Sequence, residues 1–437
     1  MRRAARAGLL LVALLLSDRL LKLYYYGHTY RYYEAGEVYW EDSHTLLLFS
    51  PDRHLFWRLK PSITMKLEET PTQYGLFFVG GRPAPYAFTV STSSRGLNSP
   101  EFECRKPPGT FRILALGDSR TMAEGVPFDS VYARRLEAWL EREAGHESRF
   151  EVVNAGVSGY SSHQGRVQLE RELLACAPDV VTVLFGINDQ DRDQGISDRD
   201  KARIFDSPLV GAQQILNRSM LVYFARRQAS KLRGLILGKT PVRARAYGPP
   251  EAGVPRVSVE QYAENLGTMV RLTRERGCRL ILLIVPTSPY AYEPSLSRDE
   301  PLQADQLQQI EQARALMRAG DVGSALQRLE NFRVVYPDSS QAHFLLAQCL
   351  QRLGRFQEAN REFVAAQQGS VFRPYEAVVR QVARQSGATL LDLSEDFTEP
   401  RPEPLYVDDM HPNEAGHHII AERLARLVQA DRRAPGR

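Results

Sequence analysis

The stretch FRILALGDSRTMAEGV, residues 111–126, decides how this sequence folds. An apolar run, residues 113–116, ends at Gly117 and Asp118 and is followed by a lone serine, Ser119. Gly, Asp and Ser are common turn formers, so one interpretation is an ordinary turn. The other is a strand that carries a small hydroxyl to the carboxyl edge of an open α/β sheet, where such folds bind ligands.

Sequence on both sides of this stretch favours the second interpretation. Strand-like runs begin near residues 111, 150, 179, 279 and 388, and helix-like runs separate them. The strands are short and apolar without polar alternation, which is typical of parallel strands covered on both faces. Strands that alternate with helices indicate a parallel α/β sheet.

Length and composition allow several domains and a large core. The chain has 437 residues, of which 43% are hydrophobic and 25% charged, as in ordinary globular proteins. The 56 basic and 52 acidic residues give a net charge of +4, and no basic stripe with interleaved aromatic residues is present. This balance does not favour nucleic acid as a partner.

Four cysteines lie far apart in the sequence. Their separations exclude the C-x-x-C spacing of metal sites, and four cysteines allow three pairings among which sequence cannot choose. Free or buried structural thiols are the favoured interpretation. The four residues are Cys104, Cys176, Cys278 and Cys349.

The N-terminus combines a basic start with a short apolar core. Arg2, Arg3 and Arg6 precede the apolar residues 8–16, as in an export signal. The core is shorter than the roughly 20 residues of a simple membrane span. We predict a signal peptide or membrane anchor over residues 1–27, with any attachment through residues 8–26 and the catalytic domain outside the cytoplasm. An amphipathic helix of a soluble protein is the alternative.

The remaining chain divides into four predicted parts. Residues 28–108, rich in aromatic residues and turn formers, form an irregular or β-containing lead-in, with short strands indicated near residues 86–90. Residues 109–300 and 371–430 form the α/β domain. Residues 303–370 form a helical insertion between them.

The insertion repeats with a period of 34 residues. Small and apolar residues recur at this spacing, and Pro337 follows the first copy, which resembles the tetratricopeptide repeat. Since two copies are fewer than the three usually needed, we expect them to lean on the α/β domain. Such repeats bind a protein partner, and a purely structural insertion is the alternative. The matching pairs are Ala313 and Ala347, Leu316 and Leu350, Gly320 and Gly354, Val322 and Phe356, Ala325 and Ala359, and Leu329 and Phe363.

Four short stretches hold the residues that ester chemistry needs: a nucleophile, a base, a group that orients the base, and donors for the oxyanion. Ser119 can attack a carbonyl, and His411 can take its proton. Asp408 precedes this histidine by three residues and can hold the ring within one loop. Gly159 offers a backbone N–H that a carbonyl oxygen can approach closely, and Asn188 offers a side-chain amide.

The order and content of these stretches resemble the four blocks of the SGNH hydrolases, also called the GDSL esterase/lipase family. The resemblance covers residues 111–290 and 385–430. It implies a flavodoxin-like three-layer α/β/α fold with a parallel sheet and serine-dependent ester chemistry, without a metal or cofactor. The matching motifs are Gly117-Asp118-Ser119, Gly159, Gly186-x-Asn188-Asp189 and Asp408-x-x-His411-Pro412.

The resemblance also implies the site roles. Ser119 is the nucleophile, and its own N–H, the Gly159 N–H and the Asn188 amide are the oxyanion donors. Asp408 and His411 complete the catalytic triad. One departure follows the nucleophile, where Arg120 either binds an anionic group or covers the site.

Competing residues fit less well. Asp409 has the wrong spacing to His411, and Ser158 does not lie in a G-x-S-x-G motif. His163 is expected to cap or pack. His417 and His418 lie on a predicted helix that points away from the loop, so no metal site is predicted.

The sequence therefore predicts a serine esterase that acts through an acyl-enzyme on an envelope or extracellular substrate. The substrate is an acylated small molecule, lipid or carbohydrate. An O-acyltransferase that modifies a cell-surface polysaccharide would use the same residues. A scaffold with a vestigial site is disfavoured, because such a protein need not keep the complete set of residues.

Overall fold

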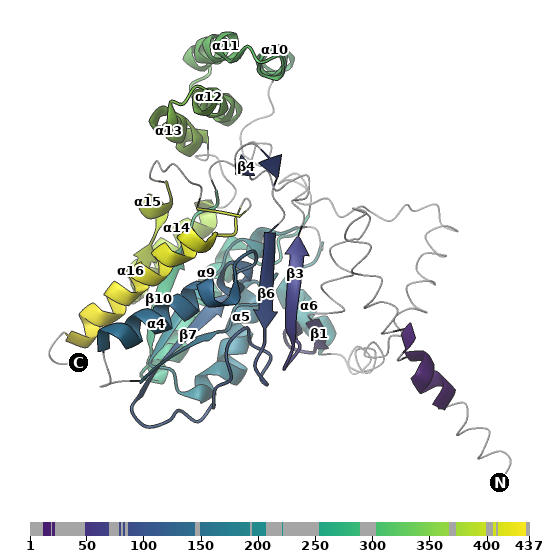
Figure 1. Cartoon of the computed structure of the whole chain (residues 1–437), viewed down its shortest axis with the longest axis vertical. Helices are drawn as coiled ribbons and strands as arrows, with labels where there is room; N and C mark the ends of the chain where they lie inside the picture. Colours follow the sequence, from purple (N-terminus) through teal and green to yellow (C-terminus); the bar gives the residue numbers. More distant parts are fainter. Residues whose placement is uncertain are drawn as a thin grey trace.

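In the computed structural model, an α/β body carries a separate group of helices, residues 304–366, at one end (Figure 1). The residues that the structure describes are 12–18, 20–21, 49–69, 78–79, 82–83, 86–144, 149–192, 195–206, 221, 253–288, 303–366, 373–398, 405–407 and 410–433.

The body is built on a parallel sheet of five strands. Its order, β8–β7–β9–β10–β11, is the flavodoxin-like order 2-1-3-4-5 when these strands are counted along the chain. The strand that leads to Ser119, β7, lies between two partners, with Ile113 opposite both Val152 and Val180. The prediction of a parallel α/β sheet is confirmed. The bounds are β7 (Thr110–Gly117), β8 (Arg149–Asn154), β9 (Val180–Leu184), β10 (Arg279–Ile284) and β11 (Thr389–Asp392).

Helices cover both faces of the sheet, because successive strand side chains point to opposite faces. Ile113 and Ala115 pack with α4 (Tyr132–Ala144) and α16 (Glu414–Arg433). Leu114 and Leu116 belong to the core on the other face. That face is covered by α5 (Ser162–Gln168), α9 (Val259–Glu275) and α14 (Arg373–Ser386). The result is the expected three-layer α/β/α arrangement.

The lead-in forms small antiparallel sheets. The hairpin β1–β2 and the pair β3–β6 place Leu55, Leu59, Phe88 and Val90 in the same core as Leu114. The strand expected near residues 86–90 is present as β6. The bounds are β1 (Phe49–Asp52), β2 (Phe56–Leu59), β3 (Thr64–Glu69), β4 (Phe78–Val79), β5 (Arg82–Pro83) and β6 (Tyr86–Ser91).

The insertion consists of two helix pairs. Gly320 and Gly354, 34 residues apart, end the first helix of each pair at φ +83° and +73°, a left-handed conformation that favours glycine. The buried apolar residues of these helices form a cluster of their own, without any residue of the sheet. The repeats were expected to lean on the α/β domain, but in the described residues their buried apolar cluster is separate from the core of that domain. The helices are α10 (Ala304–Arg318), α11 (Val322–Val335), α12 (Ser340–Arg352) and α13 (Phe356–Ala366).

The expectation of free or structural thiols is wrong for two cysteines. Cys104 and Cys176 form a disulfide with a Cα–Cα distance of 4.3 Å, whereas Cys278 and Cys349 are free and buried. Arg112 of β7 is fully buried beside this disulfide and donates to the backbone carbonyls of both bonded cysteines. The pairing depends on how the chain folds around β7, which local spacing cannot reveal.

The predicted signal or anchor falls mostly outside the described residues. Of residues 1–27, only 12–18 and 20–21 are described. Within the described part of the chain, no helix has both the length and the apolar character needed to cross a membrane.

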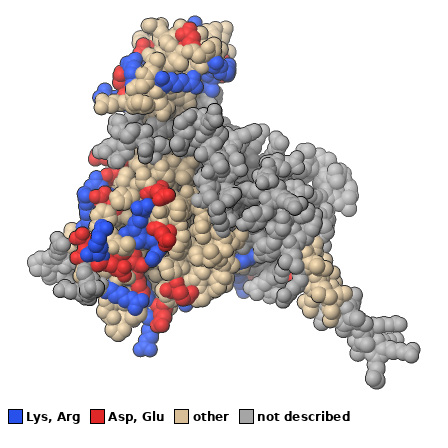
Figure 2. Space-filling model, viewed as in Figure 1, with Lys and Arg blue, Asp and Glu red and all other residues tan. Residues whose placement is uncertain are grey.

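Charge is mixed on the face that Figure 2 shows. Acidic and basic side chains alternate over α4 and α16. Arg135 of α4 pairs with Glu414 of α16 at 3.3 Å, and Arg423 of α16 pairs with Asp396 at 2.5 Å. Over these two helices, charges of opposite sign therefore offset each other.

Candidate active site

The candidate nucleophile lies at the carboxyl end of β7. Ser119 is the first residue of the short helix α3 (Ser119–Met122), and the Asp118 side chain caps this helix by accepting from the Arg120 N–H. The Ser119 Oγ lies 2.7 Å from the His411 Nε2 and is largely buried. The structure thus brings together two predicted site residues that are 292 positions apart.

The guanidinium of Arg120 is engaged by a carboxylate and a backbone carbonyl of the protein itself. Its Nε and Nη2 donate to the two carboxylate oxygens of Asp118 at 3.1 and 2.8 Å, and its Nη1 donates to the Val285 carbonyl at 3.2 Å. Both side chains of this ion pair are buried. A buried charge needs such partners. Of the two interpretations of Arg120, the contacts fit the one in which it covers the site, because it fastens the nucleophile turn to the end of β10.

The loop that carries His411 is closed on itself and fastened to the sheet. Tyr406 and Pro412 form an antiparallel bridge, and the Val407 N–H donates to the His411 carbonyl at 2.8 Å. The Tyr406 hydroxyl donates to the Pro286 carbonyl, just beyond β10. These bonds hold the imidazole over Ser119.

A carboxylate outside the predicted triad lies near the imidazole. The Glu124 Oε2 is 3.5 Å from the His411 Nε2, and the Glu124 side chain is only 10% exposed. No motif of the sequence indicated a role for Glu124, although it stands five residues after Ser119, within residues 111–126. Asp408, predicted to orient the imidazole, and its neighbour Asp409 lie outside the described residues.

Two of the three predicted oxyanion donors, Gly159 and Asn188, lie in adjoining loops. The Asn188 Nδ2, in the single turn η5 (Asn188–Gln190), donates to the Tyr160 carbonyl at 3.1 Å, one residue from Gly159. The loop before Gly159 is fastened to β7, because the Val157 N–H donates to the Gly117 carbonyl at 3.1 Å. Both candidate donors are thereby held at the sheet edge that carries the nucleophile.

Asp189 links these two loops. Its buried carboxylate accepts from the Gly186 N–H at 3.1 Å and from the Ser162 N–H and hydroxyl. Burial raises the pKa of Asp189 to about 7, although the bonds from Ser162 act in the opposite direction. The residue after Asn188 therefore joins the start of α5 to the end of β9.

The competing histidines pack, as expected for His163. His163 stacks on Phe56 with ring centroids 6.1 Å apart, and burial lowers its pKa to about 4. His417 stacks on Tyr132 and accepts from its N–H through Nδ1; burial lowers the pKa of His417 to about 3. His418 lies on the exposed side of α16. Among the described residues, no group of three or more His, Cys, Asp and Glu side chains could hold a metal ion.

Ser158, which was set aside as a nucleophile, is buried, and its carbonyl accepts from the Trp57 indole. Trp57 belongs to the lead-in and carries no motif, so nothing in the sequence linked it to the site.

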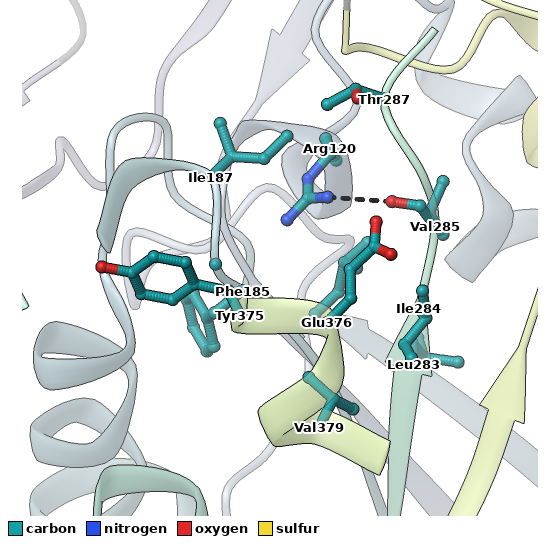
Figure 3. A pocket seen from close by; sticks show the side chains of 12 residues that line it. Arg120, Phe185, Ile187, Leu283, Ile284, Val285, Thr287, Tyr375, Glu376 and Val379 are labelled. Carbon is teal, nitrogen blue, oxygen red and sulfur yellow. Dashed lines mark hydrogen bonds between the residues drawn. The ribbon is translucent and has the colours of Figure 1, made fainter. Parts of the chain in front are cut away.

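A pocket adjoins the nucleophile turn (Figure 3). It lies between the ends of β9 and β10 and helix α14. Apolar residues such as Ile187 and Leu283 line it, and Arg120 and Glu376 project into the same space. Ser119 and His411 are not among its lining residues, so the pocket is a neighbour of the candidate site and not its reaction chamber.

Comparison with known proteins agrees with this geometry. Residues 115–323 match the GDSL-like lipase/acylhydrolase family, and residues 310–370 match a tetratricopeptide repeat. No curated protein matches the chain.

Solved structures with similarity to the chain include three esterases or lipases. An acetyl xylan esterase has 13% identity, coverage of 73% of this chain and 100% of its own, and a TM-score of 0.35. A lipase/acylhydrolase from Enterococcus faecalis has 16% identity, coverage of 75% and 99%, and a TM-score of 0.35. An acetylxylan esterase from Geobacillus stearothermophilus has 17% identity, coverage of 72% and 93%, and a TM-score of 0.34. Scores this low carry no conclusion about substrate.

The family match includes the first three motifs, at residues 117–119, 159 and 186–189, whereas the fourth motif, at residues 408–412, lies beyond it. The repeat match falls on the segment with the 34-residue period. The chain therefore carries a GDSL-like lipase/acylhydrolase domain joined to a tetratricopeptide-repeat segment.

Proposed function

We propose that the protein hydrolyses carboxylic esters of an acylated carbohydrate, lipid or small molecule outside the cytoplasm. Ser119 is the nucleophile, His411 the general base, and Asp408 the group that orients the imidazole. The observation that carries the proposal is the 2.7 Å distance between the Ser119 Oγ and the His411 Nε2, which is within reach of direct proton transfer.

The reaction proceeds in two steps. The Ser119 Oγ bonds to the ester carbonyl carbon while its proton moves to His411, and the carbonyl oxygen becomes an oxyanion that the Gly159, Asn188 and Ser119 N–H groups stabilise. The C–O bond to the alcohol then breaks, and the alcohol leaves with the proton from His411. Water, activated by His411, releases the acid and restores Ser119.

Two observations support a location outside the cytoplasm. Disulfides such as Cys104–Cys176 persist mainly in oxidising compartments. The basic and then apolar start, residues 2–16, has the character of an export signal. Protease treatment of intact cells tests this proposal: digestion of the folded domain only after lysis would contradict it.

The activity is tested with p-nitrophenyl acetate and a fluorophosphonate probe. Wild-type protein should turn over the ester and acquire the probe on Ser119, whereas Ser119→Ala should do neither. Full turnover by Ser119→Ala would overturn the proposal. Adding a sugar acceptor to the assay distinguishes hydrolysis from acyl transfer, because a transferase would yield acylated sugar in place of free acid.

A further inference from the structure

The hairpin β1–β2 reaches the loop that holds Gly159. We call residues 158–160 the oxyanion loop. The Trp57 Nε1 donates to the Ser158 carbonyl at 3.1 Å. The indole also lies against the glycine, since a Cβ built on Gly159 would be 3.2 Å from the Trp57 Cζ2. A residue of the lead-in therefore forms part of the wall behind the proposed oxyanion donor.

Every carbonyl of the oxyanion loop accepts a hydrogen bond from a different segment. Ser158 accepts from Trp57, Gly159 from the Arg256 Nη1 at 2.7 Å, and Tyr160 from the Asn188 Nδ2. The Gly159 N–H has no hydrogen-bond acceptor within the described part of the chain. All three carbonyl groups of the oxyanion loop are thus hydrogen-bonded, whereas the Gly159 N–H is available to an incoming oxyanion.

The bond to Ser158 also sets the direction of that donor. The peptide between Ser158 and Gly159 is trans and planar, so its C=O and N–H point in opposite directions. With the carbonyl held towards Trp57, the Gly159 N–H must point away from it. Glycine at φ +74° has no Cβ to resist rotation of this peptide, so the orientation depends on outside contacts.

Trp57 is itself firmly held. The Tyr160 hydroxyl donates to the Trp57 carbonyl at 2.6 Å, and the two rings meet edge to face at 5.8 Å. The Arg256 guanidinium lies 5.5 Å from the centre of the indole. The preceding residue, Phe56, has a φ of +66°, a left-handed conformation that a non-glycine residue keeps only where its surroundings hold it.

We propose that Trp57 is a positioning residue of the oxyanion hole: its indole N–H fixes the Ser158–Gly159 peptide so that the Gly159 N–H meets the developing negative charge. The inference rests on the proposed function, in which the Gly159 N–H is an oxyanion donor. Trp57 acts through the peptide and forms no bond with the reacting atoms.

The sharpest test replaces Trp57 with benzothienylalanine, which keeps the bicyclic ring and has sulfur in place of the N–H. Because the donor would lose its fixed direction, kcat for p-nitrophenyl acetate should fall by about 10- to 100-fold. KM should stay within about twofold, because the loss concerns the transition state. The rate of fluorophosphonate labelling of Ser119 should fall in parallel, and Tm should be unchanged. Trp57→Phe should act in the same direction, and Trp139→Phe, on α4, is the matched control with unchanged kinetics.

Different failures have different meanings. Unchanged kcat in the benzothienylalanine protein, with Ser119→Ala inactive, overturns the inference and leaves the proposed function intact. A raised KM with unchanged kcat also overturns it, because Trp57 would then bind substrate. A lowered Tm with unchanged kcat also overturns the inference, because Trp57 would then contribute to stability only. Activity in Ser119→Ala overturns the proposed function itself.

Discussion

Single residues at the sheet edge show what a motif can and cannot reveal. Short motifs that follow a strand or precede a helix were enough to predict four candidate site residues: Ser119, Gly159, Asn188 and His411. Glu124 and Trp57 escaped notice because their places depend on tertiary contacts, to His411 and to Ser158. Short-range sequence carries no record of such contacts.

Removal of the Asn188 amide should impair catalysis without unfolding the protein. Loss of one oxyanion donor typically costs about 10²–10³ in kcat, so we expect Asn188→Ala to lose this factor with p-nitrophenyl acetate and to keep a wild-type circular dichroism spectrum. Gln190→Ala, in the same turn, is the matched control, because no hydrogen-bond partner of the Gln190 amide is found among the described residues. A loss in kcat below about fivefold would contradict the role of Asn188.

The buried imidazole of His417 should make the fold sensitive to acid. Its pKa is about 3 in the folded protein and about 6.5 in the unfolded chain, so between these values the unfolded state binds more protons. The free energy of unfolding should therefore decrease by about 1.4 kcal/mol per pH unit as the pH falls through this window. His163, whose pKa is also lowered, likewise decreases the free energy of unfolding as the pH falls. Asp189, whose pKa is raised, has the opposite effect.

A substitution isolates the contribution of this histidine. His417→Asn keeps an acceptor for the Tyr132 N–H but does not titrate. Urea unfolding at pH 6, 5 and 4 should show that wild type loses stability faster than His417→Asn, by about 1.4 kcal/mol per unit. Since His163 and Asp189 are common to both proteins, they cancel in the difference. Parallel pH profiles would rule out a neutral buried His417.

At the scale of strands and helices, the sequence carried most of the information. Apolar runs are local, so the five strands of the sheet begin close to the positions that the pattern predicted, with helices between them. The disulfide could not be predicted in this way, because its cysteines lie 72 residues apart and meet only when β7 is in place.

This disulfide should stabilise the α/β domain strongly. Closure of a loop of 72 residues lowers the entropy of the unfolded chain enough to stabilise the fold by about 4 kcal/mol. We expect Cys104→Ala with Cys176→Ala to reduce the free energy of unfolding by roughly this amount, measured by urea titration. Reductant should have no further effect on the double variant, whereas equal stability of the two proteins would mean that the bond does not form.

The whole molecule consists of an α/β body and a repeat pair within one of its crossovers. The insertion separates β10 from α14 and β11, and it packs around its own core. The 34-residue period predicted the helix pairs because helix contacts within a repeat are local in sequence. Residues 289–302 and 367–372, which connect the pair to the body in the sequence, lie outside the described residues.

Because the repeat pair has a core of its own, a substitution in that core should destabilise the repeats without affecting the α/β body. Ala347 is fully buried between repeat helices, so Ala347→Leu should overpack this core and destabilise it by about 1–3 kcal/mol. Esterase activity should stay within about twofold of wild type. Calorimetry should show a lower first transition, with Gln351→Leu, at an exposed position of the same helix, as the control. A parallel loss of activity would show that the repeats support the catalytic domain.

The order of segments also governs when chemistry can begin during biosynthesis. A growing chain completes Ser119 early, but His411 arrives only after the sheet strands and both repeats have been made. Until α16 docks, the serine hydroxyl has no base and is an ordinary alcohol of negligible reactivity towards esters. A nascent polypeptide is therefore harmless to the acylated molecules that it meets until its last helix is in place.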